Sequence, residues 1–213
     1  ALKYGTDFWA NYYKGFYLSE FGQGLNDDPN KTRYIRPDIR MMNIGANSYY
    51  VFNYKKYANR APYINMEIQK KSAASFLLMG TLSFFKVSGD SSIIPGFLYP
   101  EFNNVRPFNS AAHYQIGVSP GFGGTLAKNG FYANMMIFGG PMLQVQDRFW
   151  SDGEQHVDLG FGLRVQNRFA LGYTNAKYFF ALTWFAEVFH TPNPEYQIQG
   201  IMNTVRLFGG FRL

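Results

Sequence analysis

The chain has 213 residues, no cysteine and a formal net charge of +6 at neutral pH. Without cysteine it has no disulfide framework and no thiolate metal site. The basic residues are dispersed rather than gathered in a stripe, so no nucleic acid partner is expected. Charged residues make up only 16% of the chain, below the roughly 25% of ordinary soluble domains, yet no apolar run reaches the roughly 20 residues of a membrane-spanning helix. One large all-β domain fits these limits.

The beginning of the chain is expected to be an N-terminal extension, residues 1–37, ahead of a barrel domain that spans residues 38–213. Phe8 to Phe21 has a strand-like pattern, and Gly22 to Lys31 reads as a loop. The extension either packs outside or beneath eight strands, or pairs with Thr32 to Ile35 and raises the number to ten. Counting this segment as one more strand would give nine, which is not expected because single-chain bacterial barrels have even numbers of strands. Of the two even numbers, eight is preferred. The chain starts without a basic segment followed by an apolar stretch, as expected of a mature form.

Eight segments alternate apolar and polar residues with the period of a β-strand. In the clearest segment, "AASFLLMGTLSFFKVS", Phe76, Leu78 and Leu82 share one face, while Thr81 and Ser83 lie on the other. Successive strand residues point to opposite sides, so one face is apolar and the other mixed. The predicted strands are Ile39–Asn53, Tyr57–Gln69, Ala73–Ser88, Ala111–Leu126, Phe131–Gln146, Val157–Phe169, Tyr178–His190 and Gln199–Leu213.

Short turns and longer loops alternate between these segments, with the brief Asn53–Lys56 connection as an exception. Asn129-Gly130 is a strong signal for a tight hairpin. Short turns at one end and longer loops at the other are typical of a transmembrane β-barrel. The short turns are Lys70–Ser72, Ala127–Gly130 and Tyr173–Lys177, and the longer loops are Gly89–Ser110, Phe149–His156 and Thr191–Ile198.

The placement of charge favours a membrane barrel over a soluble β-sandwich or a lipocalin-like barrel. A soluble barrel carries charge on its outer face and apolar residues inside. In this chain the charges share a face with Asn, Gln and Thr, while the opposite face is almost free of them. Aromatic residues also crowd the strand ends, as in the girdles of outer-membrane barrels. The basic excess suits acidic lipid head groups. We therefore expect an antiparallel up-and-down transmembrane β-barrel with both chain ends in the periplasm.

Three stretches of sequence support a family assignment. "QKKSAASFLLMG" (Gln69 to Gly80), "GDSSIIP" (Gly89 to Pro95) and "ALGYTNAKYFFAL" (Ala170 to Leu182) resemble an uncharacterised family of small outer-membrane barrels from Bacteroidota. The resemblance runs from about Arg33 to the C-terminus, and Ala74 stands where the family pattern has Gly. It implies an outer-membrane location and supplies no activity.

Charged residues on the inward face are expected to form a packed network, because an eight-stranded barrel has room only for its own side chains and buried charges must be paired. A lined pore for small solutes is the alternative, and it would need a wider barrel. The predicted members of the network are Glu67, Arg164, Arg168, Glu187, Arg206 and Arg212.

Loop 89–110, with "IIPGFLYPEFNNVRPF", is the most apolar loop. Its prolines limit its freedom, so its apolar side chains either cap the barrel mouth or dock on another protein. The candidate partner-binding residues are Phe97, Leu98, Tyr99, Phe102 and Phe108.

The histidines are the residues on which a metal-binding or catalytic function would depend. His156 shares a loop with Asp152 and Glu154, which suits a cation, although a solvated polar loop is the commoner case. His190 resembles the strand-borne histidine of lipid A deacylases, with Glu187 or Glu195 as an orienting acid. No Ser stands two residues after His190, so the expected nucleophile is missing. No catalytic residue, metal or cofactor is therefore expected.

The sequence as a whole favours a non-enzymatic outer-membrane protein that serves as an accessory subunit of a larger complex. Its expected partners are outer-membrane lipids, lipopolysaccharide and other outer-membrane proteins. Secretion, barrel-assembly and nutrient-uptake machineries are all compatible with the pattern, and the sequence does not choose among them. A lipid A-modifying acyl hydrolase that uses His190 and a narrow pore are the alternatives.

Overall fold

The chain is almost entirely β-strand in the computed structural model, which describes residues 2–18, 34–64, 68–95, 106–192 and 197–211. One short helix, α1 (Ala61–Ile64), interrupts the strands. In this part of the chain no helix is long and apolar enough to cross a membrane. The strands are β1 (Tyr4–Leu18), β2 (Tyr34–Val51), β3 (Ala73–Ser88), β4 (Phe108–Lys128), β5 (Phe131–Trp150), β6 (Gln155–Thr174), β7 (Tyr178–Pro192) and β8 (Gln197–Phe211).

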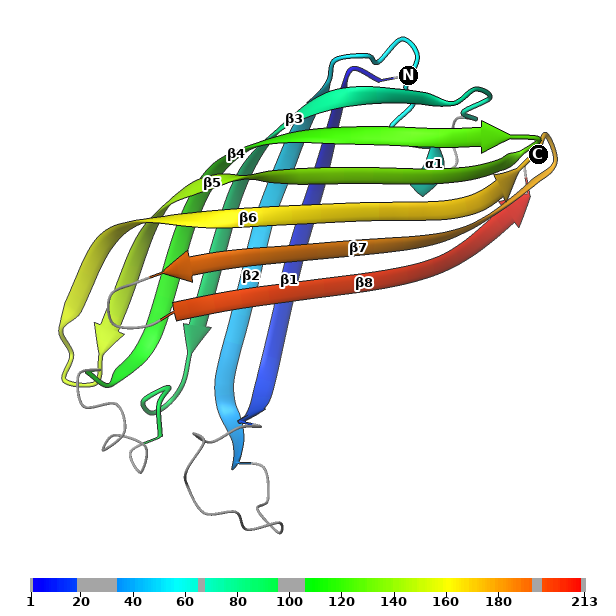
Figure 1. Cartoon of the computed structure of the whole chain (residues 1–213). Coiled ribbons are helices and arrows are strands. Elements are labelled where there is room, and N and C mark those ends of the chain that lie inside the picture. The colour runs from blue at the N-terminus through cyan, green and yellow to red at the C-terminus, as the bar shows by residue number, and fades with distance from the viewer. Residues whose placement is uncertain (1, 19–33, 65–67, 96–105, 193–196, 212–213) are drawn as a thin grey trace, which may run out of the picture.

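All eight strands form one antiparallel sheet, in which each strand pairs with its neighbours along the chain. The sheet curls into a half-barrel (Figure 1). The order of hydrogen-bonded neighbours begins at β1 and finishes at β8, so these two strands are the edges of the sheet. The predicted all-β, up-and-down architecture with eight strands is confirmed.

Two of the predictions about individual elements are wrong, and the two errors cancel in the number of strands. Tyr57–Gln69 was expected to be a strand, but the structure has α1 there and no strand among the residues of this segment that it describes. The preferred placement of residues 1–37 outside the barrel is also wrong. Residues 4–18 form β1, which pairs with β2 along its length, with Tyr4 opposite Tyr50 and Leu18 opposite Tyr34.

The two ends of the half-barrel differ. We call the end with the β4–β5 and β6–β7 turns the turn end; it also holds the β2–β3 connection, residues 52–72. The other is the loop end, where β3 joins β4 and β5 joins β6. At the turn end Asn129 and Gly130 both have positive φ, 52° and 85°. This is the conformation that a two-residue hairpin turn requires, and it explains why Asn-Gly marks the turn in the sequence.

The predicted division into an apolar and a polar face is confirmed along the strands. In β3, Phe76 and Leu82 are 71% and 61% exposed, while Thr81 and Ser83, on the opposite face, are buried. The apolar face is therefore convex and exposed, and the mixed face lines the concave interior. The largest core cluster lies in that interior toward the turn end, where side chains of β2, β3 and β5 surround a residue of the β2–β3 connection. Its members are Tyr49, Val51, Tyr57, Leu77, Met79, Met136 and Phe138.

Gly140 allows β4 and β5 to approach closely in the interior. A Cβ at this position would lie 2.2 Å from the Val118 carbonyl oxygen and 2.7 Å from the Ser119 Cα. We predict that Gly140→Ala destabilises the protein by about 1–3 kcal/mol, because backbone atoms must shift to accept the methyl group. Gly80→Ala is the control: its Cβ would have Ser48 O at 3.9 Å as its nearest contact. Denaturant unfolding of the two variants measures the difference, and equal midpoints would contradict this packing.

Candidate functional site

A buried ion pair lies at the centre of the concave face. Arg164 on β6 donates from Nη2 to Glu187 Oε1 on β7 at 2.8 Å, and the two side chains are 2% and 1% exposed. Arg164 and Glu187 were both predicted on the inward face, and the structure brings them together. Because a buried charge is costly unless a close partner of opposite charge compensates it, each side chain offsets the cost of burying the other.

A second set of contacts crosses the interior to β1. Arg168 on β6 donates from Nη2 to Asp7 Oδ2 at 2.6 Å. The guanidinium of Arg164 lies 5.5 Å from the centre of the Trp9 ring, a cation–π distance. Asp7 and Trp9 are not among the residues predicted from the sequence, because residues 1–37 are expected there to lie outside the barrel. Asp7 and Trp9 share a strand face at a spacing of two, and that was the available signal.

Uncharged polar residues extend the network across β2, β3, β4 and β5. Thr81 Oγ1 donates to Asn47 Oδ1 at 2.7 Å. Ser83 Oγ donates to Gln115 Oε1 at 2.9 Å, and Gln115 Nε2 donates to Gln144 Oε1 at 3.3 Å. All five side chains are buried. Amides and hydroxyls at such distances bind one another, and the set contains no acid–base pair beside a nucleophile.

The other predicted members of the network have different outcomes. Glu67 and Arg212 lie outside the described residues. Arg206 is on β8, opposite Thr183 of β7, and it is exposed. It lies on the inner face, as predicted, but it stays exposed, because β8 is an edge of the sheet and has a single neighbour among the described strands.

The segment from residue 52 to 64 closes the turn end from within. Tyr57 is fully buried. Tyr63 Oη donates to Asn134 Oδ1 at 2.6 Å, and Asn134 Nδ2 donates to Tyr57 Oη at 3.0 Å. Tyr132 Oη donates to the Pro62 carbonyl at 3.2 Å. We call this segment the plug. These three contacts go to side chains of β5, and Asn53 also donates to Ser75 Oγ and to the Ala74 carbonyl of β3, both at 2.8 Å, so the barrel wall holds the plug in place.

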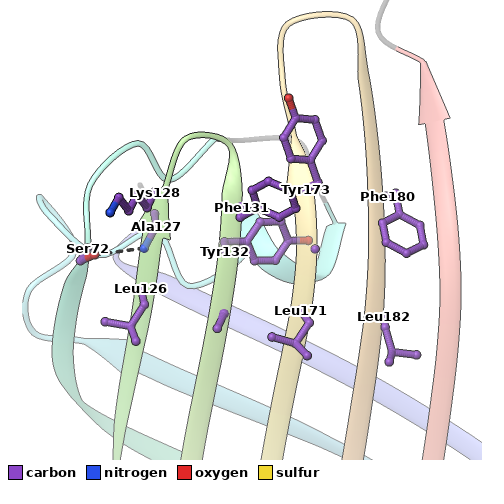
Figure 2. A pocket seen from close by; sticks show the side chains of 12 residues that line it. Ser72, Leu126, Ala127, Lys128, Phe131, Tyr132, Leu171, Tyr173, Phe180 and Leu182 are labelled. Carbon is purple, nitrogen blue, oxygen red and sulfur yellow. Dashed lines mark hydrogen bonds between the residues drawn. The ribbon is translucent and has the colours of Figure 1, made fainter.

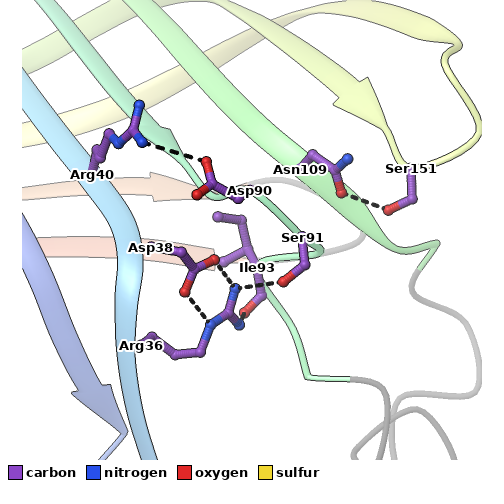
Figure 3. A network of polar contacts seen from close by, with 8 residues as sticks. All are labelled: Arg36, Asp38, Arg40, Asp90, Ser91, Ile93, Asn109 and Ser151. Carbon is purple, nitrogen blue, oxygen red and sulfur yellow. Dashed lines mark hydrogen bonds and ion pairs between the residues drawn. The ribbon is translucent and has the colours of Figure 1, made fainter.

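At the loop end, Arg36 of β2 pins the start of the β3–β4 loop (Figure 3). Its guanidinium donates to both carboxylate oxygens of Asp38 at 2.8 Å, to Ser91 Oγ at 3.1 Å and to the Ile93 carbonyl at 3.1 Å. Arg36 is buried. The described beginning of the loop is therefore fastened to the sheet.

The loop's first apolar residues pack on their own barrel. Ile93 and Ile94 lie against Phe108, Ala111 and Trp150. Phe108 is 6% exposed, so its predicted role as an exposed partner contact does not fit the structure. The described part of the loop therefore packs against the ends of β4 and β5. The remaining partner-binding candidates, Phe97, Leu98, Tyr99 and Phe102, lie outside the described residues.

The acidic residues near His156 are occupied by arginines. Arg106 contacts Asp152 and lies 2.7 Å from Glu154. The Arg106 hydrogen bond lowers the pKa of Asp152 below its ordinary value. His156 lies 3.0 Å from Asp158 instead. The residues suggested for a cation are thus not gathered, and the described residues hold no cluster of three His, Asp or Glu side chains suited to a metal ion.

His190 and Glu187 lie on opposite faces of β7. Glu187 points into the interior and binds Arg164, and a separation of three residues reverses the direction of a strand side chain. Glu187 therefore does not orient His190 as an acid–base partner. Glu195, the other acid considered, lies outside the residues that the structure describes.

The contribution of the buried Arg164–Glu187 pair to stability can be tested by mutation. Glu187→Ala leaves the Arg164 charge buried and uncompensated, and we expect a loss of about 3–5 kcal/mol in unfolding free energy. The double variant Arg164→Met, Glu187→Leu should recover most of that loss, because it removes both charges. Asp90→Ala is the control, since the Asp90–Arg40 pair is exposed and should cost less than about 1 kcal/mol. Unfolding in detergent measures all three, and a double variant as unstable as Glu187→Ala would argue against the pair.

Comparison with known proteins gives one family. A family model described as "Domain of unknown function (DUF4421)" matches residues 2–213, essentially the whole chain. No curated protein and no solved structure matches. Because the family model spans nearly every residue of the half-barrel, the chain belongs to the DUF4421 family of domains of unknown function.

Proposed function

We propose that this protein is an integral β-barrel protein of a bacterial outer membrane. The observation that carries the proposal is the exposed apolar face of the sheet. On β6 alone, Leu159, Phe161 and Leu163 are 75%, 73% and 60% exposed, while Arg164 and Gln166 beside them are buried. An apolar surface of this extent is unfavourable in water. It is the expected surface of a sheet whose outer face contacts lipid.

Strands are a suitable means of crossing a bilayer for this chain. Every backbone polar group in the hydrocarbon core must be paired, and antiparallel strands satisfy each other when their edges are covered. The short turns of β4–β5 and β6–β7 match the periplasmic end of bacterial barrels. The resemblance to outer-membrane barrels of Bacteroidota supports the same location, with both chain ends in the periplasm.

We further propose that the role is non-enzymatic and that the protein is a subunit of a larger outer-membrane complex. The filled interior speaks against a solute pore: Arg164, Gln144, Gln166 and Phe138 are all almost fully buried near its centre. The separation of Glu187 from His190 speaks against the acyl hydrolase. A structural role remains the best-supported one.

The edges of the sheet suggest how a partner joins. β1 and β8 each have a neighbour on one side only in the described sheet. On β8 both faces are exposed: Thr204 and Arg206 of the inner face as well as Val205 of the outer face. In lipid these edges must be paired. Strands of another outer-membrane protein, added at the β8 edge, would pair them and cover the inner face of β8.

The lipid-facing side gives the first prediction of this proposal. Leu163→Arg should destabilise the protein by roughly 2–4 kcal/mol if it lies near the bilayer midplane. Gln166→Leu, on the inner face, should be much milder, because no hydrogen-bond partner of the Gln166 amide is found in the structure. Folding into lipid vesicles, followed by urea titration, compares the two. Equal effects would show that the faces are misassigned.

The partner gives the second prediction. A photo-crosslinking residue placed at Val205 on β8 should crosslink to another outer-membrane protein in native membranes. The same residue at Val118 of β4 should not, since Val118 is equally apolar and 54% exposed but lies between two paired strands. Mass spectrometry identifies the products. Crosslinks from Val205 to β1 of the same chain would mean that the barrel closes on itself and would remove this argument for a subunit.

A further inference from the structure

The turn end carries a set of exposed lysines without acidic partners. The segments that form it hold a single carboxylate, Glu67, which lies outside the described residues. No ion pair to these lysines is found among the residues that the structure describes. We call the set the lysine collar: Lys55, Lys56, Lys70, Lys71, Lys128 and Lys177.

The loop end shows that this arrangement is not a general consequence of the basic composition. Among the described residues four arginines lie there, and each of them contacts a carboxylate. The pairs are Arg36–Asp38, Arg40–Asp90, Arg106 with Asp152 and Glu154, and Arg148–Asp158. The excess positive charge of the chain is therefore concentrated at one end, with charges free to attract anions from outside.

An apolar groove lies on the outer face beside Lys128, one of the collar lysines. It has a volume of about 780 Å³ and runs over the turn-end parts of β4, β5, β6 and β7 (Figure 2). Leu126, Phe131, Leu171, Phe180 and Leu182 line it and are exposed. Lys128 also lines the groove, on the β4 side.

The rim of the groove is built by specific contacts. The Ala127 amide donates to Ser72 Oγ at 3.0 Å, which ties the end of β4 to the β2–β3 connection. The rings of Phe131 and Tyr173 pack edge to face, with 4.8 Å between their centres. The centres of the Tyr173 and Tyr178 rings are 5.9 Å apart. Such a wall of aromatic rings beside a basic rim is the pattern found where a bilayer's hydrocarbon meets its head groups.

We propose that this groove and the lysine collar bind an anionic glycerophospholipid. An acyl chain lies along Leu126, Leu171 and Leu182, and the phosphate lies at the level of the turns, between Lys128 and Lys177. Charge complementarity decides the class of lipid, because the described part of the collar offers cations to a phosphate and no carboxylate to the ammonium of a zwitterionic head group. The inference rests on the proposed membrane location and adds to it the lipid class and the end that binds it.

The test uses the full chain refolded in detergent and titrated with phosphatidylglycerol or phosphatidylcholine, with bound lipids counted by native mass spectrometry. We expect tighter binding of phosphatidylglycerol, weakened roughly fivefold per lysine by Lys128→Gln and Lys177→Gln. Lys14→Gln with Lys86→Gln is the matched control: it removes the same charge nearer the loop end and should leave binding unchanged. Equal binding of the two lipids, or equal effects of the two double variants, would overturn the inference.

A second variant tests the groove separately from the charge. Ala133→Trp fills the groove that Ala133 lines, so it should lower phosphatidylglycerol binding without any change in charge. Ala10→Trp, on the exposed outer face of β1, should not. Lipid A and unlabelled phosphatidylglycerol are compared as competitors for bound phosphatidylglycerol. If lipid A is the stronger competitor, the groove is a site for lipopolysaccharide, and the proposal is overturned.

The outcome for membrane location is read independently. Heat-modifiable migration on gels and a β-rich circular dichroism spectrum in vesicles report whether the chain inserts at all. A chain that inserts but shows no preference for the anionic lipid refutes this inference and leaves the outer-membrane proposal standing. A chain that stays folded and soluble without detergent refutes both.

Discussion

The structure depends on one geometric constraint: successive residues of a strand point to opposite sides of the sheet. When the sheet curls, these two sides become a convex outside and a concave inside. Apolar residues then form a continuous outer surface, and residues such as Gln115 and Glu187 are enclosed. A shift of one residue in any strand would exchange these environments, so the register of the whole sheet is strongly determined.

Enclosing polar side chains creates the need for the interior network. Arg164 and Glu187 neutralise each other on neighbouring strands, which the ladder alone would bring together. Arg168 and Asp7 are different, because they join β6 to β1 across the concave space. The sheet's curvature brings these strands within reach, and the ion pair in turn stabilises that curvature. The network therefore has a structural explanation that requires no substrate.

The two ends of the half-barrel are stabilised by different kinds of interaction. The turn end is closed by the chain's own plug, held by Tyr57, Tyr63 and Asn134. The loop end is held by ion pairs around Arg36 and Arg106. As a result the loop end presents balanced charge, while the turn end presents lysines that remain available. In the proposed membrane location, this asymmetry of charge would distinguish the two leaflets of the bilayer.

The sequence by itself determined the fold class and the face of the sheet on which most residues lie, while the number of strands agreed only because the wrongly predicted strand at Tyr57–Gln69 offset the missed β1. The fold class and the faces follow from period-two alternation and from local turn chemistry such as Asn129-Gly130, which act over a few residues. It did not identify the plug: Ile64, Met66 and Ile68 alternate like a strand, yet α1 lies at the start of that run. Nor did it place β1 in the sheet or show that Asp7 meets Arg168. Those outcomes depend on contacts between residues far apart in the chain, and only the curvature of the assembled sheet decides which of them form.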